Sequence, residues 1–178
     1  EGLANQGAGD YACVALISMR MRRGEYAEGL AAVDRLERKR PGSAQPHAIR
    51  GRIQRLLKNP DGARAAFEKA LTVDPSYYPA ITELAAMDID ARKFDVAMKR
   101  LQDAAARMPT DPRLWLDQAD VRRKAGAKPD EIEGLLRKAS AADAGAALPR
   151  FMLVDHLLAQ RQAKRDGPHD QQARASRR

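Results

Sequence analysis

The stretch A-R-A-A-F-E-K-A-L-T-V-D-P, from Ala63 to Pro75, carries the pattern that decides the fold. Ala63, Phe67 and Ala70 recur at intervals of four and three residues, which places them on one face of an α-helix. Asp74-Pro75 ends this helix, because proline cannot continue it. The small alanines allow a neighbouring helix to approach closely, so the stretch predicts the second helix of a packed pair.

The same pattern occurs at equal distances before and after this stretch. The closing prolines are Pro41, Pro75 and Pro109, and the apolar rows are Gly29, Val33 and Leu36, then Ala97, Leu101 and Ala104. Their common period of about 34 residues is that of the tetratricopeptide repeat (TPR), in which stacked pairs of antiparallel helices share a continuous core. We therefore predict an all-α fold, a TPR-type α-solenoid wound as a right-handed superhelix.

The repeat divides the chain into a lead-in, an array and a tail. We expect the lead-in at residues 1–9, the array at 10–161 and a disordered or frayed basic tail at 162–178, where Gly167-Pro168 would interrupt a helix. The units of the array are 10–43, 44–77, 78–111 and 112–146, followed by the half-unit 147–161. The fourth unit needs one extra residue near Lys128-Pro129.

Local signals for the ends of helices agree with this division. Asn59-Pro60 and Asp111-Pro112 each place a capping residue before a proline at the first helical position. Gly24 and Gly126 fall where the two helices of a unit meet, and glycine favours such turns.

Composition supports a folded helical protein. Of 178 residues, 44% are hydrophobic and 31% charged, which argues against a disordered polyampholyte. The net charge of +8 is compatible with nucleic acid, anionic lipid or an acidic polymer as partner. One cysteine excludes an internal disulfide framework and a cysteine-based zinc site. No signal peptide or membrane-spanning run is visible. The sequence opens on Glu1 without an initiator Met, so we expect a fragment or processed product whose targeting information lies outside this sequence.

Five stretches resemble one group of TPR proteins more specifically. They are Arg22–Pro41 (R-R-G-E-Y-A-E-G-L-A-A-V-D-R-L-E-R-K-R-P), His47–Ile53 (H-A-I-R-G-R-I), Ala63–Ala80, Ala125–Ala139 (A-G-A-K-P-D-E-I-E-G-L-L-R-K-A) and Pro149–Leu158 (P-R-F-M-L-V-D-H-L-L). Together they resemble the TPR-repeat lipoproteins of the PEP-CTERM/exosortase system of Gram-negative bacteria. The resemblance covers about residues 10–161. It implies a periplasmic or outer-membrane protein that serves exopolysaccharide export or protein sorting, attached to a membrane only through an anchor outside this chain.

Candidate partner-binding residues follow from the register, because the first helix of each unit lines the concave groove. They are Ser18, Arg22, Arg52, Arg55, Thr82, Asp90, Asp120 and Arg123. Arginines in a groove suit carboxylate, phosphate or uronate groups, although exposed arginines are more often solvated or paired with acids. TPRs that resemble the chaperone-tail carboxylate clamp have Lys and Asn at two groove positions of their first repeat. This sequence has Val14 and Ser18 there, so we do not expect that binding mode.

Other distinctive residues fit structural roles better than chemical ones. We expect Cys13 near the packing seam, His47 and Trp115 in packing positions, and Arg50 leaning its stem on the groove wall with its head exposed. His47, His156 and His169 are isolated, with no partner at metal-ligand spacing. We therefore expect no cofactor, no metal and no catalytic site.

Three functional hypotheses are compatible with these features. The first is a non-enzymatic TPR scaffold for protein–protein interactions in the bacterial cell envelope, with proteins or peptides in its groove. The second is a binder of acidic polysaccharide or another polyanion through the groove arginines, whose binding would weaken with salt. The third is a cytoplasmic TPR adaptor. We expect no specific recognition of nucleic acid.

Overall fold

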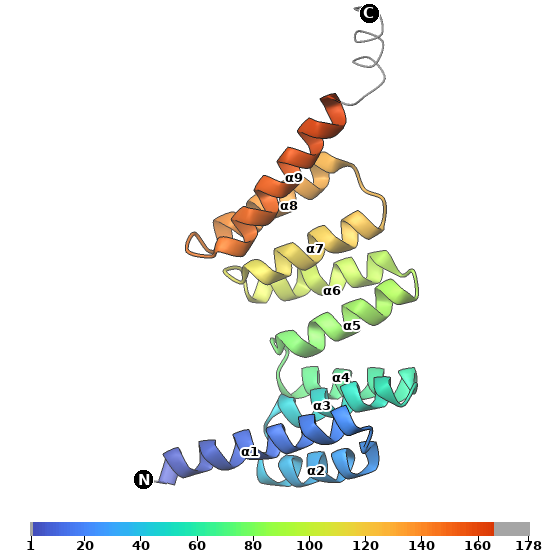
Figure 1. Ribbon diagram of the computed structural model, residues 1–178, viewed down its shortest axis with the longest axis vertical. Coiled ribbons are helices and arrows are strands. Elements are labelled where there is room, and N and C mark those ends of the chain that lie inside the picture. The colour runs from blue at the N-terminus through green and yellow to red at the C-terminus, as the bar shows by residue number, and fades with distance from the viewer. Residues whose placement is uncertain (1, 166–178) are drawn as a thin grey trace, which may run out of the picture. The chain divides into compact units, whose positions relative to one another are not determined.

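The computed structural model describes residues 2–165, with the side chains of residues 12–165, and this part of the chain is all α-helical. Figure 1 shows the helices in chain order. They are α1 (Gly2–Arg23), α2 (Tyr26–Lys39), α3 (Ala44–Leu56), α4 (Pro60–Val73), α5 (Tyr78–Asp90), α6 (Phe94–Arg107), α7 (Pro112–Lys124), α8 (Pro129–Ala142) and α9 (Ala147–Arg165). The predicted all-α class is confirmed.

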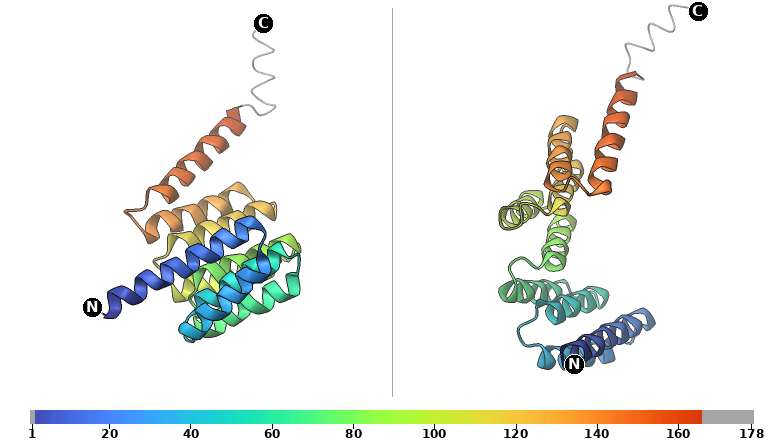
Figure 2. Two further views of the ribbon diagram at one scale, coloured as in Figure 1. Left: turned by 60° about the horizontal axis from the view of Figure 1, so that its bottom comes forward. Right: turned by 90° about the vertical axis from the view of Figure 1, so that its left-hand side faces the viewer.

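The chain forms two compact units that divide after Asp90. In the first unit, each helix from α1 to α5 packs on the next helix in the chain. The second unit follows the same rule from α6 to α9 (Figure 1; Figure 2). Packing between sequence neighbours is the expected property of helical repeats.

The repeat period predicted from the prolines is visible in the inner turns of the helix pairs. Gly24, Lys58, Arg92 and Gly126 all have positive φ angles, between 56° and 77°, and follow one another at the same interval as the prolines. Three of these turns also share a bond of the Schellman type, from the N–H of residue 25, 59 or 127 to the carbonyl of residue 20, 54 or 122. The two glycines occupy the turns where the sequence predicted them; the lysine and the arginine were not expected there.

The closing turns confirm the extra residue of the fourth repeat. The carbonyls of Arg40, Asp74, Met108 and Asp143 accept a bond from the N–H three residues later. The first three follow at equal intervals, and the fourth comes one residue later than this interval predicts. The α7–α8 link, 125–128, is one residue longer than the α3–α4 link, 57–59. The extra residue therefore lies beside Lys128-Pro129, as predicted.

The predicted caps are also present. The side chain of Asn59 accepts a hydrogen bond from the N–H of Gly62 at 3.0 Å, and that of Asp111 accepts one from the N–H of Arg113 at 3.0 Å. Each cap precedes a proline at the start of its helix, where the missing N–H costs nothing.

The helices at both ends extend beyond the predicted array of residues 10–161. Helix α1 already begins at Gly2, so residues 2–9 of the expected lead-in are helical. Helix α9 continues to Arg165, so residues 162–165, which we assigned to a disordered or frayed tail, are helical instead. The rest of that tail lies outside the described residues.

Small residues determine how closely helices pair within each unit. In the first unit, Phe67 and Leu84 are fully buried among alanines of α3, α4 and α5. A second cluster there is built around Ile17, Val33 and Leu36. In the second unit, Leu136 and Ile132 pack with Ala119 and Ala139. Burying these side chains is the main stabilising contribution in such repeats.

Candidate functional site

A groove of about 520 Å³ lies in the first unit, between α1, α3 and the start of α5. Its lining consists of Val14, Ser18, Met21, Arg22, Gln45, Ala48, Ile49, Arg52, Leu56, Tyr77 and Pro79. All three helices are first helices of their pairs. The groove therefore lies on the face that the repeat register predicted, and it contains three of the predicted residues: Ser18, Arg22 and Arg52.

The groove has an apolar interior and a basic rim. Most of its lining side chains are aliphatic or aromatic, and none carries a negative charge. Arg22 and Arg52 are exposed at the rim. The hydroxyl of Ser18 donates to the carbonyl of Val14 at 2.9 Å, so it is occupied within its own helix. This arrangement suits a ligand with apolar side chains and an acidic group.

The arginines of α3 are partly neutralised by an acid that the sequence analysis did not select. Nε of Arg52 donates to Oε1 of Glu83 at 3.1 Å, and Nη1 of Arg55 pairs with Oε2 of the same carboxylate. Glu83 is only 17% exposed, whereas Arg52 is 54% exposed. One carboxylate thus bridges two guanidinium groups across α3 and α5, and Arg22 is left as the groove arginine for which the described residues show no acidic partner.

A signal for Glu83 does exist in the sequence. The first helices of successive repeats lie side by side, so residues one repeat period apart, or one helical turn less, come close together. The repeat period less one helical turn is about 31 residues. Glu83 lies 31 residues after Arg52 and 28 after Arg55. Opposite charges at these separations predict an ion pair between neighbouring first helices.

Tyr77 is a groove residue that the sequence analysis missed. It precedes α5, in the closing turn of the second repeat, and packs against the cluster around Phe67. Burial raises the pKa of its phenol, the positive charge of Arg52 lowers it, and Asp74 raises it, with a net increase. Tyr77 is therefore a neutral hydroxyl beside Arg52 at neutral pH.

The remaining predicted residues do not join this groove. Arg55 and Asp90 line a smaller hollow of about 190 Å³ with Lys58, Pro60 and Met87. Thr82 donates its hydroxyl to the carbonyl of Pro79 at 3.2 Å and lines neither hollow. In the second unit, Asp120 lies 3.9 Å from Arg123 and 2.8 Å from Lys124.

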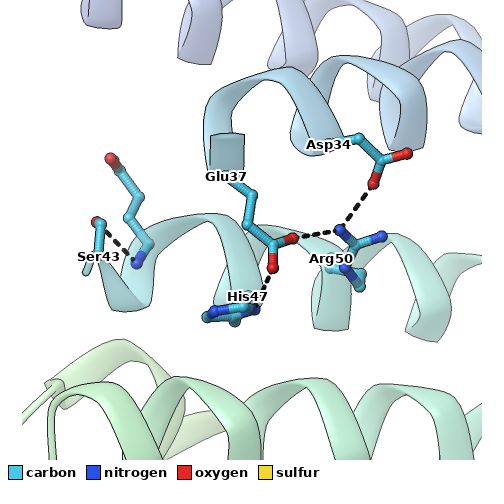
Figure 3. A network of polar contacts seen from close by, with 6 residues as sticks. Asp34, Glu37, Ser43, His47 and Arg50 are labelled. Carbon is cyan, nitrogen blue, oxygen red and sulfur yellow. Dashed lines mark hydrogen bonds and ion pairs between the residues drawn. The ribbon is translucent and has the colours of Figure 1, made fainter. Parts of the chain in front are cut away.

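A polar network links α2 and α3 (Figure 3). Arg50 donates to Asp34 at 2.8 Å and to Glu37 at 2.7 Å, and Glu37 also lies 3.8 Å from Nδ1 of buried His47. Burial lowers the pKa of Arg50, but its hydrogen bonds and charge interactions with the two acids together raise it. The expectation that Arg50 leans its stem on the groove wall with its head exposed was wrong, because Arg50 does not line the groove and its head is paired with two carboxylates of α2.

Three other residues occupy structural positions. His47 is buried, as predicted. Trp115 packs against the cluster of Leu116, Ala119 and Leu136, and Nζ of Lys138 lies 5.1 Å from the centre of its ring. Cys13 is partly buried against the cluster around Ile17. These positions agree with the predicted packing roles.

The described residues form neither a metal site nor a membrane span. Within residues 12–165, no three His, Cys, Asp or Glu side chains lie together in a way that could hold a metal ion. Of the helices that the structure describes, none is both long and apolar enough to cross a bilayer.

Family models identify the repeats. Two models described as tetratricopeptide repeat match residues 15–78 and 55–121. No curated protein sequence matches this chain. The overlapping matches run through both units, from α1 into α7.

Solved structures share the fold at low sequence identity. PilF of Pseudomonas aeruginosa is 18% identical, with a TM-score of 0.64 over 89% of this chain and 72% of that chain. A thermophilic TPR protein of Thermus thermophilus is 20% identical, with a TM-score of 0.60 over 85% and 82%. The first TPR of Spaghetti (RPAP3), bound to the HSP90 peptide SRMEEVD, is 17% identical, with a TM-score of 0.53 over 66% and 95%. These similarities show a TPR solenoid fold.

Proposed function

This chain is built from tetratricopeptide repeats, and from that premise we propose that its groove between α1, α3 and α5 binds an extended peptide segment of a partner protein. TPR proteins are generally non-enzymatic scaffolds for protein–protein interaction, and we assign the same role here. The observation that carries the proposal is the groove itself, which combines apolar walls with an arginine rim and contains no acid.

The chemistry of the groove defines the peptide. Apolar side chains of the ligand would lie against Val14, Ile49 and Leu56, where they leave water. An acidic side chain or a terminal carboxylate would bind Arg22, because guanidinium and carboxylate form paired hydrogen bonds. The HSP90 peptide held by one structural neighbour is likewise acidic at its end.

The setting we propose is the bacterial cell envelope, in the periplasm or at the outer membrane. This follows from the resemblance to the TPR lipoproteins of the PEP-CTERM/exosortase system. The partner would then belong to the machinery for exopolysaccharide export or exosortase-linked protein sorting. A cytoplasmic adaptor is the alternative, and it would use the same groove.

The alternative of a general polyanion binder has less support from the geometry. Arg52 and Arg55 already share Glu83, and Arg123 lies beside Asp120. Sequence-independent binding of polyanions needs several unneutralised cations in a row. The groove offers mainly Arg22.

A pull-down with matched variants tests the proposal. The bait is the full chain, the prey is an envelope extract of an exopolysaccharide-producing bacterium, and the groove variant is Arg22→Glu with Leu56→Glu. The control is Arg23→Glu with Leu57→Glu, which makes the same chemical changes at exposed neighbours outside the groove lining.

We expect defined proteins that the wild type and the control retain at high salt and that the groove variant loses. Equal capture by both variants would contradict groove binding. Capture of acidic polymer alone, lost at high salt, would favour the polyanion hypothesis. A second pull-down from cytoplasmic extract distinguishes the adaptor hypothesis.

A further inference from the structure

The two ends of the groove in the first unit differ in chemistry. Gln45 is the second residue of α3, and Tyr77 immediately precedes α5. Arg22 is the last residue but one of α1, and Leu56 is the last residue of α3. The first helices of neighbouring repeats run in the same direction, so Gln45 and Tyr77 lie at one end, the polar end. Arg22 and Leu56 lie at the other, the basic end.

The polar end carries two hydrogen-bonding groups that are open to a ligand. Gln45 and Tyr77 are both partly buried in the groove lining. In the part of the chain whose side chains are described, no hydrogen bond joins the side-chain amide of Gln45 or the hydroxyl of Tyr77 to another protein group. A few polar groups in a largely apolar pocket fix the orientation of a ligand, because they are satisfied only when it is bound or when water replaces it.

The chemistry of the polar end matches a backbone peptide group. A side-chain amide has donors and an acceptor, so Gln45 can bind both the N–H and the C=O of an extended chain. The raised pKa of Tyr77 keeps its hydroxyl protonated at neutral pH, and it can therefore donate to a carbonyl. The positive charge that acts on Tyr77 is that of Arg52, which is already bonded to Glu83. An uncharged group therefore fits this end better than a carboxylate does.

Between its two ends the groove is mainly apolar. Val14, Ala48 and Ile49 lie there, and the hydroxyl of Ser18 is bonded to the carbonyl of Val14. Apolar side chains of a ligand would leave water against this lining, which favours binding without fixing the position of the ligand along the groove. The position must then be fixed by the polar groups at the ends.

The separation of the ends corresponds to a definite length of peptide. From Gln45 to Leu56, at 1.5 Å per residue, α3 extends over about 16 Å. An extended chain advances about 3.3 Å per residue, so about five residues of a ligand reach from one end to the other.

We propose that the groove recognises an extended segment in which a carboxylate and a backbone peptide group lie about five residues apart, with apolar side chains between them. Arg22 binds the carboxylate, which is supplied by an acidic side chain or by a chain terminus. Gln45 and Tyr77 bind the peptide group and set the position of the segment. This inference rests on the proposed function of the groove, and it adds the spacing of the ligand and the residues that recognise it.

Selection from libraries of short random peptides tests the carboxylate. The bait is the full chain, and one library displays its peptides with a free C-terminus while the other displays them internally, which distinguishes a terminal from a side-chain carboxylate. We expect enriched peptides with a carboxylate at one end and apolar residues next to it. Arg22→Gln should lose the preference for the carboxylate and keep the preference for apolar residues. Arg23→Gln, at an exposed position outside the groove lining, should select as the wild type does.

A chemical double-mutant cycle tests the polar end. Each backbone nitrogen of a selected peptide is methylated in turn, which removes one donor, and binding is measured by calorimetry. Methylation about five residues from the carboxylate should weaken binding to the wild type by about fivefold and hardly affect binding to Gln45→Ala. Gln102→Ala, at an exposed site on α6, should respond as the wild type does. Tyr77→Phe should weaken binding by about threefold, and Tyr26→Phe, outside the groove lining, should not.

The outcomes separate this inference from the proposed function. If the wild type enriches no peptide, the proposed function fails and the inference fails with it. If peptides are enriched but Gln45→Ala shows the methylation profile of the wild type, or Arg22→Gln still selects a carboxylate, peptide binding stands and the roles of the two ends are overturned. Circular dichroism shows whether each variant keeps its helices. The methylation scan on the wild type needs no variant, and a profile without a sensitive position at the expected spacing also overturns the inference.

Discussion

The ring of Phe67 in α4 lies directly against the backbone of Gly51 in α3. A β-carbon at position 51 would lie 2.6 Å from Cε1 of Phe67, well inside the distance at which carbon atoms can pack. Both residues are buried, so neither can move toward solvent. Glycine at this position therefore sets the separation of α4 from α3, and α3 lines the groove with residues from Gln45 to Leu56.

Gly51→Ala should destabilise the protein by about 1–3 kcal/mol, because an added methyl group in a filled core forces its neighbours apart. Urea unfolding followed by circular dichroism measures the change. Gly134→Ala is the matched control, since no atom lies within 4 Å of a β-carbon there. It should stabilise α8 by about 0.5–1 kcal/mol through helix propensity. A Gly51→Ala variant as stable as the wild type would contradict the close packing.

The second prediction concerns the inner turns, which join the two helices of each repeat. Lys58 has φ of 56°, in the left-handed region where side chains other than glycine are strained. Lys58→Gly should raise the free energy of unfolding by about 0.5–1 kcal/mol. Gly126→Ala, at the equivalent turn with φ of 77°, should lower it by about 1 kcal/mol. Thermal unfolding of the two variants checks both signs, and changes in the same direction would contradict the account.

The fold could be predicted further than the site, for a physical reason. Helix periodicity, proline spacing and caps such as Asn59 are local, so the sequence alone located the helix pairs and the extra residue near Lys128. Ion pairs between helices depend on how two helices are rotated against each other, which local patterns do not specify. The sequence analysis therefore misplaced Arg50 and overlooked Glu83. Thr82 was assigned to the groove by register, but α5 lines the groove only near its start, through Pro79.

The ion pair of Arg50 and Glu37 should contribute modestly to stability. A double-mutant cycle with Arg50→Ala and Glu37→Ala should give a coupling free energy of about 0.5–1 kcal/mol at low salt and less at high salt, because both groups are partly exposed. The exposed pair of Arg137 and Glu133 within α8 is the comparison, with an expected coupling of about 0.3–0.5 kcal/mol. No coupling between Arg50 and Glu37 would show that the network of Figure 3 is not stabilising.

Asp111 makes stability depend on pH in the acid range. Hydrogen bonding from the side chain of Arg113 lowers the pKa of Asp111, burial raises it, and the net pKa lies below its usual value. A carboxyl with a lowered pKa stabilises the fold above its unfolded pKa, and this contribution is lost as the pH falls through the folded pKa. Asp111→Asn keeps the cap of α7 but loses the charge.

The difference in unfolding free energy between wild type and Asp111→Asn should therefore be at most about 1 kcal/mol at neutral pH, because the partner is exposed to solvent. Below about pH 4 the difference should shrink toward zero as the carboxyl is protonated. Urea unfolding at several pH values measures it. A difference that grows on acidification would contradict a lowered pKa for Asp111.

A variant of Glu83 distinguishes the two hypotheses for the groove, a peptide-binding site and a general polyanion-binding site. Its carboxylate occupies Arg52 and Arg55 at once, so an incoming acid must compete with an internal one that is already largely desolvated. Glu83→Gln removes this competitor with little change in shape and leaves two guanidinium groups beside the groove. Binding of polyglutamate, measured by fluorescence anisotropy, should then strengthen by about fivefold, which corresponds to about 1 kcal/mol, and should weaken with salt.

The control is Glu68→Gln, the same change of charge at an exposed site on α4. Equal gains for both variants would mean that net charge alone is responsible. Adding Arg52→Ala to Glu83→Gln should remove most of the gain, because Arg52 lines the groove and Arg55 does not. If the wild type already binds polyglutamate as tightly as Glu83→Gln does, then Glu83 does not shield the two arginines. The groove would then bind negative charge in general, and not the apolar side chains of a peptide.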